Sequence, residues 1–137
     1  MDKQKKVLIL CTGNSCRSIM AEALVNAKLG GCVQAFSSGV KASGTVNAFA
    51  KKILKDSGLW RDEYHSKNLN EVINNDYDLV VTVCDNAKEN CPIFPKKVKT
   101  IHVGFVDPSG KYEKEYEKTL LELEDRLLPV IKQTLCL

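Results

Sequence analysis

Apolar runs and amphipathic stretches alternate along this chain of 137 residues. Residues 7–10 form a continuous, β-favouring apolar run, as expected of a strand buried on both faces. Similar signals predict further strands at residues 33–37, 78–83 and 98–103. Between them, apolar positions spaced three and four residues apart predict helices over residues 17–29 and about 46–56. Strands alternating with helices favour right-handed crossovers, so we expect a single α/β domain over residues 1–137, with an open four-stranded parallel sheet flanked by helices.

The last segment, from about residue 112, has the pattern of one long helix. Its apolar stripe recurs at helical spacing, at Tyr116, Leu120, Leu123, Leu127 and Ile131. Pro129 lies within this stretch, and a proline inside a helix removes one backbone donor and crowds the preceding turn. We therefore expect the helix to be kinked near Pro129.

Composition and charge narrow the possible functions. The chain has 20 basic and 17 acidic residues and a net charge of +3, so it lacks the electrostatic signature of a protein that binds nucleic acid or an anionic membrane. The charged N-terminal residues precede an apolar run too short for a signal peptide, and no stretch approaches the roughly 20 apolar residues of a membrane span. We therefore expect a cytoplasmic protein that binds neither nucleic acid nor membrane.

Six cysteines are the unusual feature of the composition. Structural disulfides are rare in the cytoplasm, so clustered cysteines there indicate redox or metal chemistry more than a disulfide framework. Arginine, by contrast, is scarce and occurs only at positions 17, 61 and 126. An arginine close to a cysteine is therefore informative in this chain.

One such arginine lies in residues 11–18, which connect the first predicted strand to the first predicted helix and which we call the oxyanion loop. Its residues are Cys11, Thr12, Gly13, Asn14, Ser15, Cys16, Arg17 and Ser18. A loop that enters a helix N-terminus presents unpaired amides and the positive end of the helix dipole to an anion. Gly13 permits backbone torsions closed to other residues, Asn14 tolerates a left-handed conformation, and Arg17 can grip two oxygens at once.

Cys11 is expected at the floor of the oxyanion loop. The helix dipole, Arg17 and the hydroxyl of Ser18 should favour its thiolate and lower its pKa, which makes Cys11 a candidate nucleophile toward a bound oxyanion. The alternative is that Cys11 is merely buried at a strand end and that Arg17 only begins a helix. Asp107 follows the fourth predicted strand and should reach the same edge of the sheet, where it can protonate a departing oxygen. By itself, Asp107-Pro108 is also a common turn.

Two further cysteines bound residues 84–91, which we call the redox segment. Cys84 directly follows the third predicted strand and should face the oxyanion loop, whereas Cys91 lies too far along the chain for ordinary zinc-ligand spacing. In a regular helix their Cα atoms would be about 10 Å apart, while a disulfide requires about 4.4–6.8 Å, so they can join only if the segment unwinds. The alternative is that both are small buried residues, as we expect for Cys32 and Cys136.

Over essentially its whole length the chain resembles the thioredoxin-coupled arsenate reductases, which have the low-molecular-weight protein tyrosine phosphatase fold. The similarity rests on the oxyanion loop and on segments spread along the chain, at residues 20–22, 37–39, 80–84, 90–93, 104–105 and 107–108. The oxyanion loop is shared with the phosphatases, whereas the pair Cys84 and Cys91 is particular to the reductases.

This resemblance implies a relay of three cysteines. Cys11 would attack arsenate held by Arg17 and the loop amides, while Asp107 protonates the departing hydroxyl. Cys84 would then attack the adduct, which releases arsenite and leaves a Cys11–Cys84 disulfide. Cys91 would convert this bond into a Cys84–Cys91 disulfide, which thioredoxin reduces. The resemblance further implies a monomer with no tightly bound cofactor.

The chain departs from its relatives in three places. One branch of the reductases binds a potassium ion beside the loop, at positions that correspond here to Asn14, Glu22, Ser37, Ser66 and Asn68. Asn68 is an amide where that branch has a carboxylate, which reduces the charge available to hold the ion. Val106 replaces the second acid that often precedes the catalytic one. Ser109-Gly110 follows Asp107-Pro108 in place of an aromatic residue, which favours a small inorganic substrate over phosphotyrosine.

Two other functions fit parts of this pattern. A low-molecular-weight phosphatase acting on phosphotyrosine needs Cys11, Arg17 and Asp107, but neither Cys84 nor Cys91. A non-enzymatic sensor of arsenic or another oxyanion would use the same cysteines as ligands and would bind without turnover. The need for Cys84 separates the phosphatase from the reductase, and multiple turnover separates the sensor from both.

Overall fold

The structure is a computed structural model that describes residues 4–91, 94–108 and 110–137. Pro92, Ile93 and Ser109 therefore lie outside the described residues. The resemblance at residues 92–93 and the substrate preference inferred from Ser109 concern these positions.

Four parallel strands form one sheet in the order β2-β1-β3-β4, which confirms the predicted architecture. The strands are β1 (Lys5–Cys11), β2 (Val33–Gly39), β3 (Leu79–Thr82) and β4 (Lys99–His102). The first strand pairs on both edges, and its apolar run from Val7 to Leu10 is completely buried. A continuous apolar run is what a strand covered on both faces needs, so hydrophobic burial accounts for the central position of β1.

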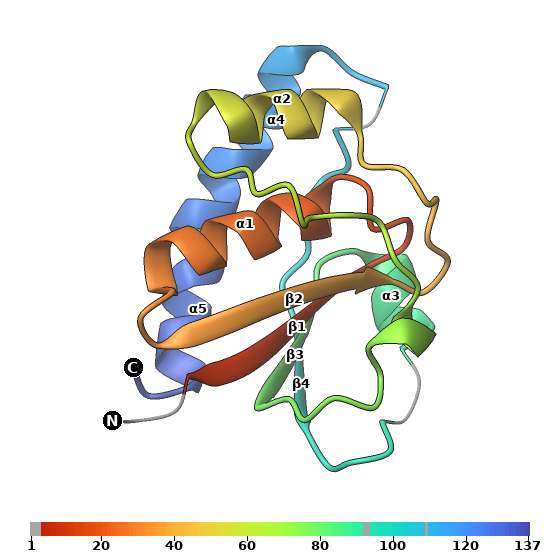
Figure 1. Cartoon of the computed structure of the whole chain (residues 1–137), viewed down its shortest axis with the longest axis vertical. Coiled ribbons are helices and arrows are strands. Elements are labelled where there is room, and N and C mark those ends of the chain that lie inside the picture. The colour runs from red at the N-terminus through yellow and green to blue at the C-terminus, as the bar shows by residue number, and fades with distance from the viewer. Residues whose placement is uncertain (1–3, 92–93, 109) are drawn as a thin grey trace.

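Helices connect and cover these strands. They are α1 (Arg17–Leu29), α2 (Ala48–Asp56), α3 (Asp85–Glu89), α4 (Glu113–Glu122) and α5 (Leu128–Thr134), with a short 3₁₀ turn, η1 (Leu69–Glu71), that the pattern did not predict. The predicted bounds of α1 are confirmed. This helix packs along β1 and β2 and also contacts α2 and α4, so it forms the centre of the helical layer seen in Figure 1.

The C-terminal helix is interrupted just before Pro129. Between α4 and α5 the backbone forms a π-helical turn, η2 (Leu123–Leu127), and Pro129 follows in the first turn of α5. The wider turn accommodates the missing proline amide and the bulk of its ring without ending the helix. The expected irregularity is therefore present as a π-turn, and the apolar residues Leu123, Leu127 and Ile131 remain completely buried across it.

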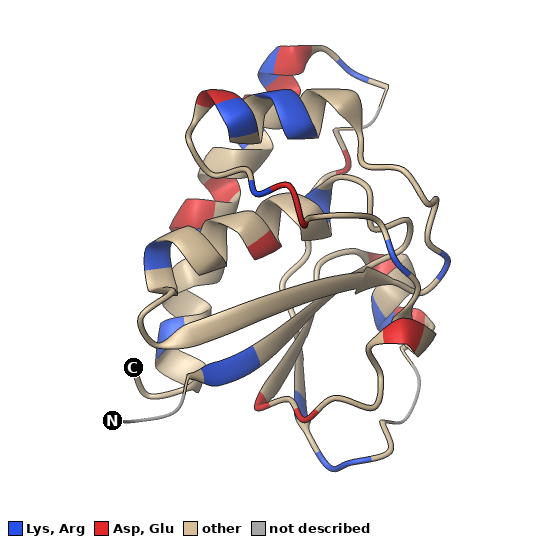
Figure 2. Cartoon of the chain, in the orientation of Figure 1, with Lys and Arg blue, Asp and Glu red and all other residues tan. Residues whose placement is uncertain are grey.

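The topology brings the chemically interesting segments to one end of the sheet. The oxyanion loop follows β1 and α3 follows β3, so both lie at the carboxyl ends of the strands (Figure 1). Basic and acidic residues are interspersed over the helices and loops, as Figure 2 shows. No helix within the part of the chain that the structure describes combines the length and the apolar character needed to cross a bilayer.

Candidate active site

The oxyanion loop is anchored along its outer side. Four of its carbonyl groups, those of Cys11, Thr12, Gly13 and Ser15, accept hydrogen bonds of 2.8–3.1 Å from the amides of Val40, Lys41, Ser43 and Asn47, respectively. A peptide carbonyl and the amide that follows it point in opposite directions. These bonds therefore turn the loop amides toward the interior of the loop, where they can surround an oxyanion.

A buried polar network supports the loop from beneath. Asn14 has a left-handed backbone, with φ of 49°, which confirms the prediction made for this residue. Its Nδ2 donates to Oγ of Ser18 at 2.8 Å and to Oγ of Ser37 at 2.9 Å, and its Oδ1 accepts from the amide of Lys67 at 2.9 Å. Asn14, Ser18 and Ser37 have no solvent exposure, so losing any of these bonds would leave a buried polar group unpaired.

The close approach that requires a glycine occurs at Gly39, at the end of β2. A Cβ atom there would lie 2.4 Å from the carbonyl oxygen of Thr12 and 3.0 Å from the amide nitrogen of Asn14. Gly13, by contrast, does not have a left-handed backbone, and a Cβ atom there would find its nearest neighbour at an ordinary 3.6 Å. The loop therefore depends on a glycine of the neighbouring strand more than on its own.

Arg17 is the first residue of α1, and its side chain is turned toward the loop that carries Asp107. Its Nη1 donates to the carbonyl of Phe105 at 3.0 Å, and its Nη2 lies 3.5 Å from Oδ2 of Asp107. The buried Nε has no acceptor among the described residues. An unpaired buried donor of this kind points to an acceptor that belongs to a ligand, and an oxyanion in the loop would supply it.

Cys84 lies close enough to Cys11 for each thiol to shift the pKa of the other. The interaction with Cys11 lowers the pKa of Cys84 to about 5, and hydrogen bonds from the Thr12 hydroxyl and the Ala87 amide act in the same direction. The interaction with Cys84 and burial raise the pKa of Cys11, while the charge of Arg17 opposes this. Without a ligand, the neighbouring thiol and burial thus outweigh the effect of Arg17 on which the expected lowering of the Cys11 pKa was based.

Cys84 lies at the mouth of a cavity of about 320 Å³ that is lined by Arg17, Cys84, Asp85, Gly104, Phe105 and Val106. The thiol caps the N-terminus of α3 and accepts from the amide of Ala87 at 3.4 Å. Oγ1 of Thr12 lies 3.2 Å from the Cys84 sulfur and 3.1 Å from Oδ1 of Asn86, so the oxyanion loop and the redox segment meet at this hydroxyl. Asp107, with 49% of its side chain exposed, remains accessible to solvent protons.

The other cysteines differ in their surroundings. Cys16 is buried, and burial together with the nearby charge of Asp107 raises its pKa to about 12, so it is a neutral thiol at physiological pH. Burial also raises the pKa of Cys91. Cys32 and Cys136 are exposed, so the expectation that they are packing residues is wrong. Both lie close to chain turns, where the apolar pattern gives no information about exposure.

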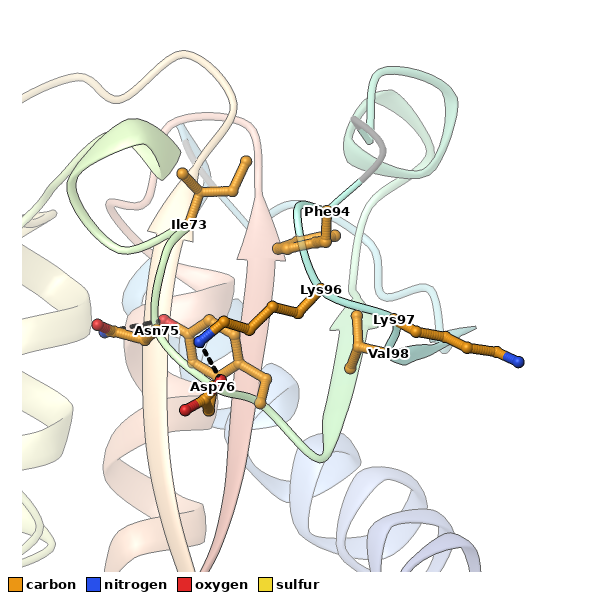
Figure 3. A pocket seen from close by; sticks show the side chains of 8 residues that line it. Ile73, Asn75, Asp76, Phe94, Lys96, Lys97 and Val98 are labelled. Atoms are coloured by element: carbon orange, nitrogen blue, oxygen red, sulfur yellow. Dashed lines mark hydrogen bonds and ion pairs between the residues drawn. The ribbon is translucent and has the colours of Figure 1, made fainter.

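The redox segment is helical over only the five residues of α3, and Ala87 is the one buried residue of that helix. Ahead of β4, residues 94 and 96–98 line a cavity of about 70 Å³ at the amino ends of β3 and β4, which Figure 3 shows. An ion pair joins Lys96 to Asp76 at this cavity, and both side chains are largely exposed.

The positions expected to hold potassium lie beneath the oxyanion loop, and their oxygen atoms already have partners. Asn68 Oδ1 accepts from the amide of Ala42 at 2.7 Å, and Ser66 Oγ donates to the carbonyl of Gly13 at 3.0 Å. Residues 4–91, 94–108 and 110–137 contain no cluster of three or more histidine, cysteine or acidic side chains arranged to bind a metal. The oxygen atoms of Asn68 and Ser66 therefore serve hydrogen bonds within the protein.

The remaining positions, Glu22 and Ser37, are bonded to each other. Ser37 Oγ donates to Glu22 Oε1 at 2.6 Å, and the ammonium of Lys67 lies 3.9 Å from the same carboxylate oxygen. Burial raises the pKa of Glu22, and the charge of Lys67 and the bond from Ser37 oppose this effect. A cation is thus present beside the carboxylate, and this cation is a side chain of the protein.

Sequence reasoning did not identify several residues that complete the site. Phe105 offers the carbonyl that holds Arg17, and the guanidinium of Arg126, in the π-turn η2, lies 4.6 Å from the centre of the Phe105 ring. His102 Nε2 lies 3.2 Å from Oδ1 of Asp85, which links β4 to the start of α3. These contacts join residues that are far apart in the sequence, so local patterns do not reveal them. The one local signal was Pro129, which predicted an irregular helix near Arg126.

Comparisons with known proteins show the family to which the chain belongs. Residues 6–135 match the family model of low molecular weight phosphotyrosine protein phosphatases. The chain is 43% identical, over 90% of its length and 93% of the relative, to a protein of Staphylococcus haemolyticus named arsenate reductase 2. Among solved structures, it is similar to the arsenate reductase of Archaeoglobus fulgidus (35% identity, TM-score 0.71, covering 91% of this chain and 98% of that one).

It is also similar to the low molecular weight protein tyrosine phosphatase of T. tengcongensis, with 31% identity and a TM-score of 0.80 over 95% of this chain and 99% of that one. Reductases and phosphatases thus share this fold, and the residues around the oxyanion loop must decide between the two chemistries.

Proposed function

We propose that this chain, which belongs to the low molecular weight phosphotyrosine protein phosphatase family, is an enzyme that reduces arsenate to arsenite. The observation that carries the proposal is the position of the Cys84 thiol, which lines the same cavity as Arg17, lies 3.2 Å from Oγ1 of Thr12 in the oxyanion loop, and is close enough to Cys11 for each thiol to shift the pKa of the other. A second thiol in contact with the nucleophile serves no purpose in phosphate ester hydrolysis, but it is required if electrons are to be transferred. The arsenate reductase named among its relatives supports this choice.

The first step forms a bond between sulfur and arsenic. Arsenate would bind to the loop amides and to the guanidinium of Arg17, and its negative charge would be balanced by that guanidinium and the helix dipole. The Cys11 proton passes to the thiolate of the neighbouring Cys84, and the Cys11 thiolate attacks arsenic. An arsenic-bound hydroxyl, protonated by Asp107, leaves as water, and arsenic stays pentavalent.

The second step reduces arsenic. After Cys84 loses its proton, the Thr12 hydroxyl and the Ala87 amide stabilise its thiolate again. This thiolate attacks the sulfur of Cys11, and a Cys11–Cys84 disulfide forms. The electron pair of the sulfur–arsenic bond passes to arsenic, which becomes trivalent and leaves as arsenite after it takes up protons. Two thiol electrons balance the reduction.

The third step moves the disulfide away from the oxyanion loop. Cys91, after losing its proton, attacks the sulfur of Cys84, and Cys11 leaves as a thiolate. The helical turn between Cys84 and Cys91 must unwind for the two sulfur atoms to meet. Thioredoxin then supplies two electrons and two protons to the Cys84–Cys91 disulfide, and the enzyme returns to its starting state. The absence of regular apolar anchoring along α3, where Ala87 is the one buried residue, supports this step.

Hydrolysis of aryl phosphates is expected as a slow side activity. The oxyanion loop, Arg17 and Asp107 provide the nucleophile, the anion site and the acid that such hydrolysis requires, and the fold is shared with phosphatases. This activity needs neither Cys84 nor Cys91, so it serves as an internal control for the integrity of the oxyanion loop.

The test is a coupled assay that follows NADPH oxidation with arsenate, thioredoxin and thioredoxin reductase. We expect multiple turnover by the wild-type protein and a loss of at least about 10³-fold in Cys84→Ser and in Cys91→Ser, with hydrolysis of an aryl phosphate retained. Cys32→Ser, at an exposed cysteine, is the matched control and should be fully active. Sustained arsenate turnover by Cys84→Ser would exclude the relay, and stoichiometric binding of arsenic without turnover would identify a sensor.

A further inference from the structure

A buried ion pair lies under the oxyanion loop and takes no part in the chemistry described above. Only 9% of Lys67 and 6% of Glu22 is exposed, and the ammonium lies 3.9 Å from the carboxylate oxygen. Burying a charge costs several kcal/mol unless an opposite charge and hydrogen bonds compensate it. A pair buried in this position therefore has a structural or functional reason to persist.

The backbone of Lys67 places its side chain accurately. The amide of Lys67 donates to Oδ1 of Asn14 at 2.9 Å, and the carbonyl of Lys67 accepts from the amide of Gly39 at 2.9 Å. The ammonium also donates to the carbonyl of His65 at 3.1 Å. Both backbone polar groups of Lys67 are thus hydrogen-bonded, one to Asn14 of the oxyanion loop and the other to Gly39, which contacts the loop. These bonds fix the backbone from which the side chain places its ammonium beside Glu22.

The charge of Lys67 sets the direction of the hydrogen bonds that reach the loop. An ionised carboxylate can only accept, so Ser37 must use its hydroxyl hydrogen to donate to Glu22. The oxygen of Ser37 is then available to accept from Nδ2 of Asn14. Asn14 carries the left-handed backbone of the oxyanion loop. The cation, the carboxylate, the hydroxyl and the amide therefore form one polarised chain that ends in the loop.

We propose that the ammonium of Lys67 is a built-in cation that replaces a bound monovalent metal ion beneath the oxyanion loop, and that Lys67 is thereby a positioning residue for the loop. The inference stands on the geometry around Glu22, so it does not depend on which oxyanion the enzyme transforms. Wild-type protein should need neither potassium nor sodium, because the positive charge is covalently part of the chain.

The test measures thermal unfolding and aryl phosphate hydrolysis in potassium chloride and in choline chloride at equal ionic strength. The wild-type Tm and kcat/KM should be the same in both salts. Lys67→Met, which removes the charge and keeps most of the side-chain volume, should lower kcat/KM by about 10-fold or more in choline chloride, because the loop is misplaced. Potassium should then raise its Tm by several degrees by binding beside Glu22, and should restore part of its activity.

Two further variants serve as controls. Lys28→Met removes another lysine paired with a glutamate, Glu124, but this pair is exposed, so neither activity nor the response to potassium should change. The double variant Glu22→Gln/Lys67→Met removes both buried charges and should fold without any response to potassium, even if Lys67→Met alone is too unstable to study. A potassium-specific rise in the wild-type Tm, or a Lys67→Met protein that is as active as wild type in choline chloride, would overturn the proposal.

Discussion

The oxyanion loop and the redox segment lie side by side at the carboxyl end of the sheet, yet they are held in opposite ways. The loop is fixed by backbone hydrogen bonds on its outer side and by the fully buried Asn14 beneath it. In the redox segment, α3 buries only Ala87, and the first residue of this helix, Asp85, has 88% of its side chain exposed. A rigid loop suits the stabilisation of charge by preorganised dipoles, whereas the proposed transfer of a disulfide requires the segment to open.

We expect the largest effect on catalysis in the oxyanion loop, at Arg17. Arg17→Lys keeps the charge but loses the planar fork that reaches both the Phe105 carbonyl and a bound oxyanion. We expect kcat/KM for arsenate and for an aryl phosphate to fall together by about 10²–10³-fold, or about 2.7–4 kcal/mol. Steady-state kinetics of both reactions measure this, and Arg61→Lys, at an exposed arginine, should leave them unchanged. A fall in only one reaction would mean that the two chemistries do not share one anion site.

The anchoring of the loop can be tested at Gly39. In Gly39→Ala the new Cβ would press on the backbone of Thr12 and Asn14, so the loop must shift. We expect the free energy of unfolding to fall by about 1–3 kcal/mol and both activities to be lost with it. The matched control is Gly31→Ala, where a Cβ meets nothing within 4 Å and stability should stay within about 0.5 kcal/mol. Denaturant titration followed by circular dichroism gives both values, and an unaltered Gly39→Ala protein would contradict the rigid-loop description.

The thiol pair connects the two regions and has a definite pH dependence. Since the pKa of Cys84 is lowered to about 5, one thiolate of the pair should persist from neutral pH down to about that value and be lost below it. In Cys84→Ser the neighbouring thiol that raises the pKa of Cys11 is gone, while the charge of Arg17 remains, so the pKa of Cys11 should fall. Alkylation rates and thiolate absorbance across a pH series report these values. A Cys11 that titrates unchanged in Cys84→Ser would show that the two thiols do not share a proton.

We expect the smallest effect on stability in the redox segment, at Asp85. Asp85→Ala removes the contact with His102, and because Asp85 is largely exposed the global stability should change by less than about 1 kcal/mol. The amides of residues 85–90 should nevertheless exchange hydrogen faster, because one of the few links that close α3 is gone. Hydrogen exchange by mass spectrometry measures this, with Glu89→Ala, at the other end of α3, as the comparison. Unchanged exchange in Asp85→Ala would show that α3 is held by other contacts.

Particular residues show where prediction from sequence succeeds. The apolar run at residues 7–10 predicts the central strand, and the spacing from Arg17 to Leu29 predicts α1 to the residue, because burial and helical periodicity are local properties of the sequence. The left-handed backbone of Asn14 is also predictable, since few side chains tolerate that conformation. The roles of Cys11, Cys84 and Cys91 stay predictions that the kinetic experiments must decide.

The sequence by itself determined the order of strands and helices, the oxyanion loop between β1 and α1, and the placement of Cys84 after a central strand, because each follows from periodicity or from position along the chain. Tertiary structure alone decided the rest. The contact between Thr12 and Cys84, the close approach of Gly39 to the loop and the ammonium of Lys67 beside Glu22 each join residues far apart in sequence. Such contacts depend on how the elements pack, and so do the pKa shifts of Cys11 and Cys84 and the position of an ammonium beside Glu22, since burial and neighbouring groups determine them.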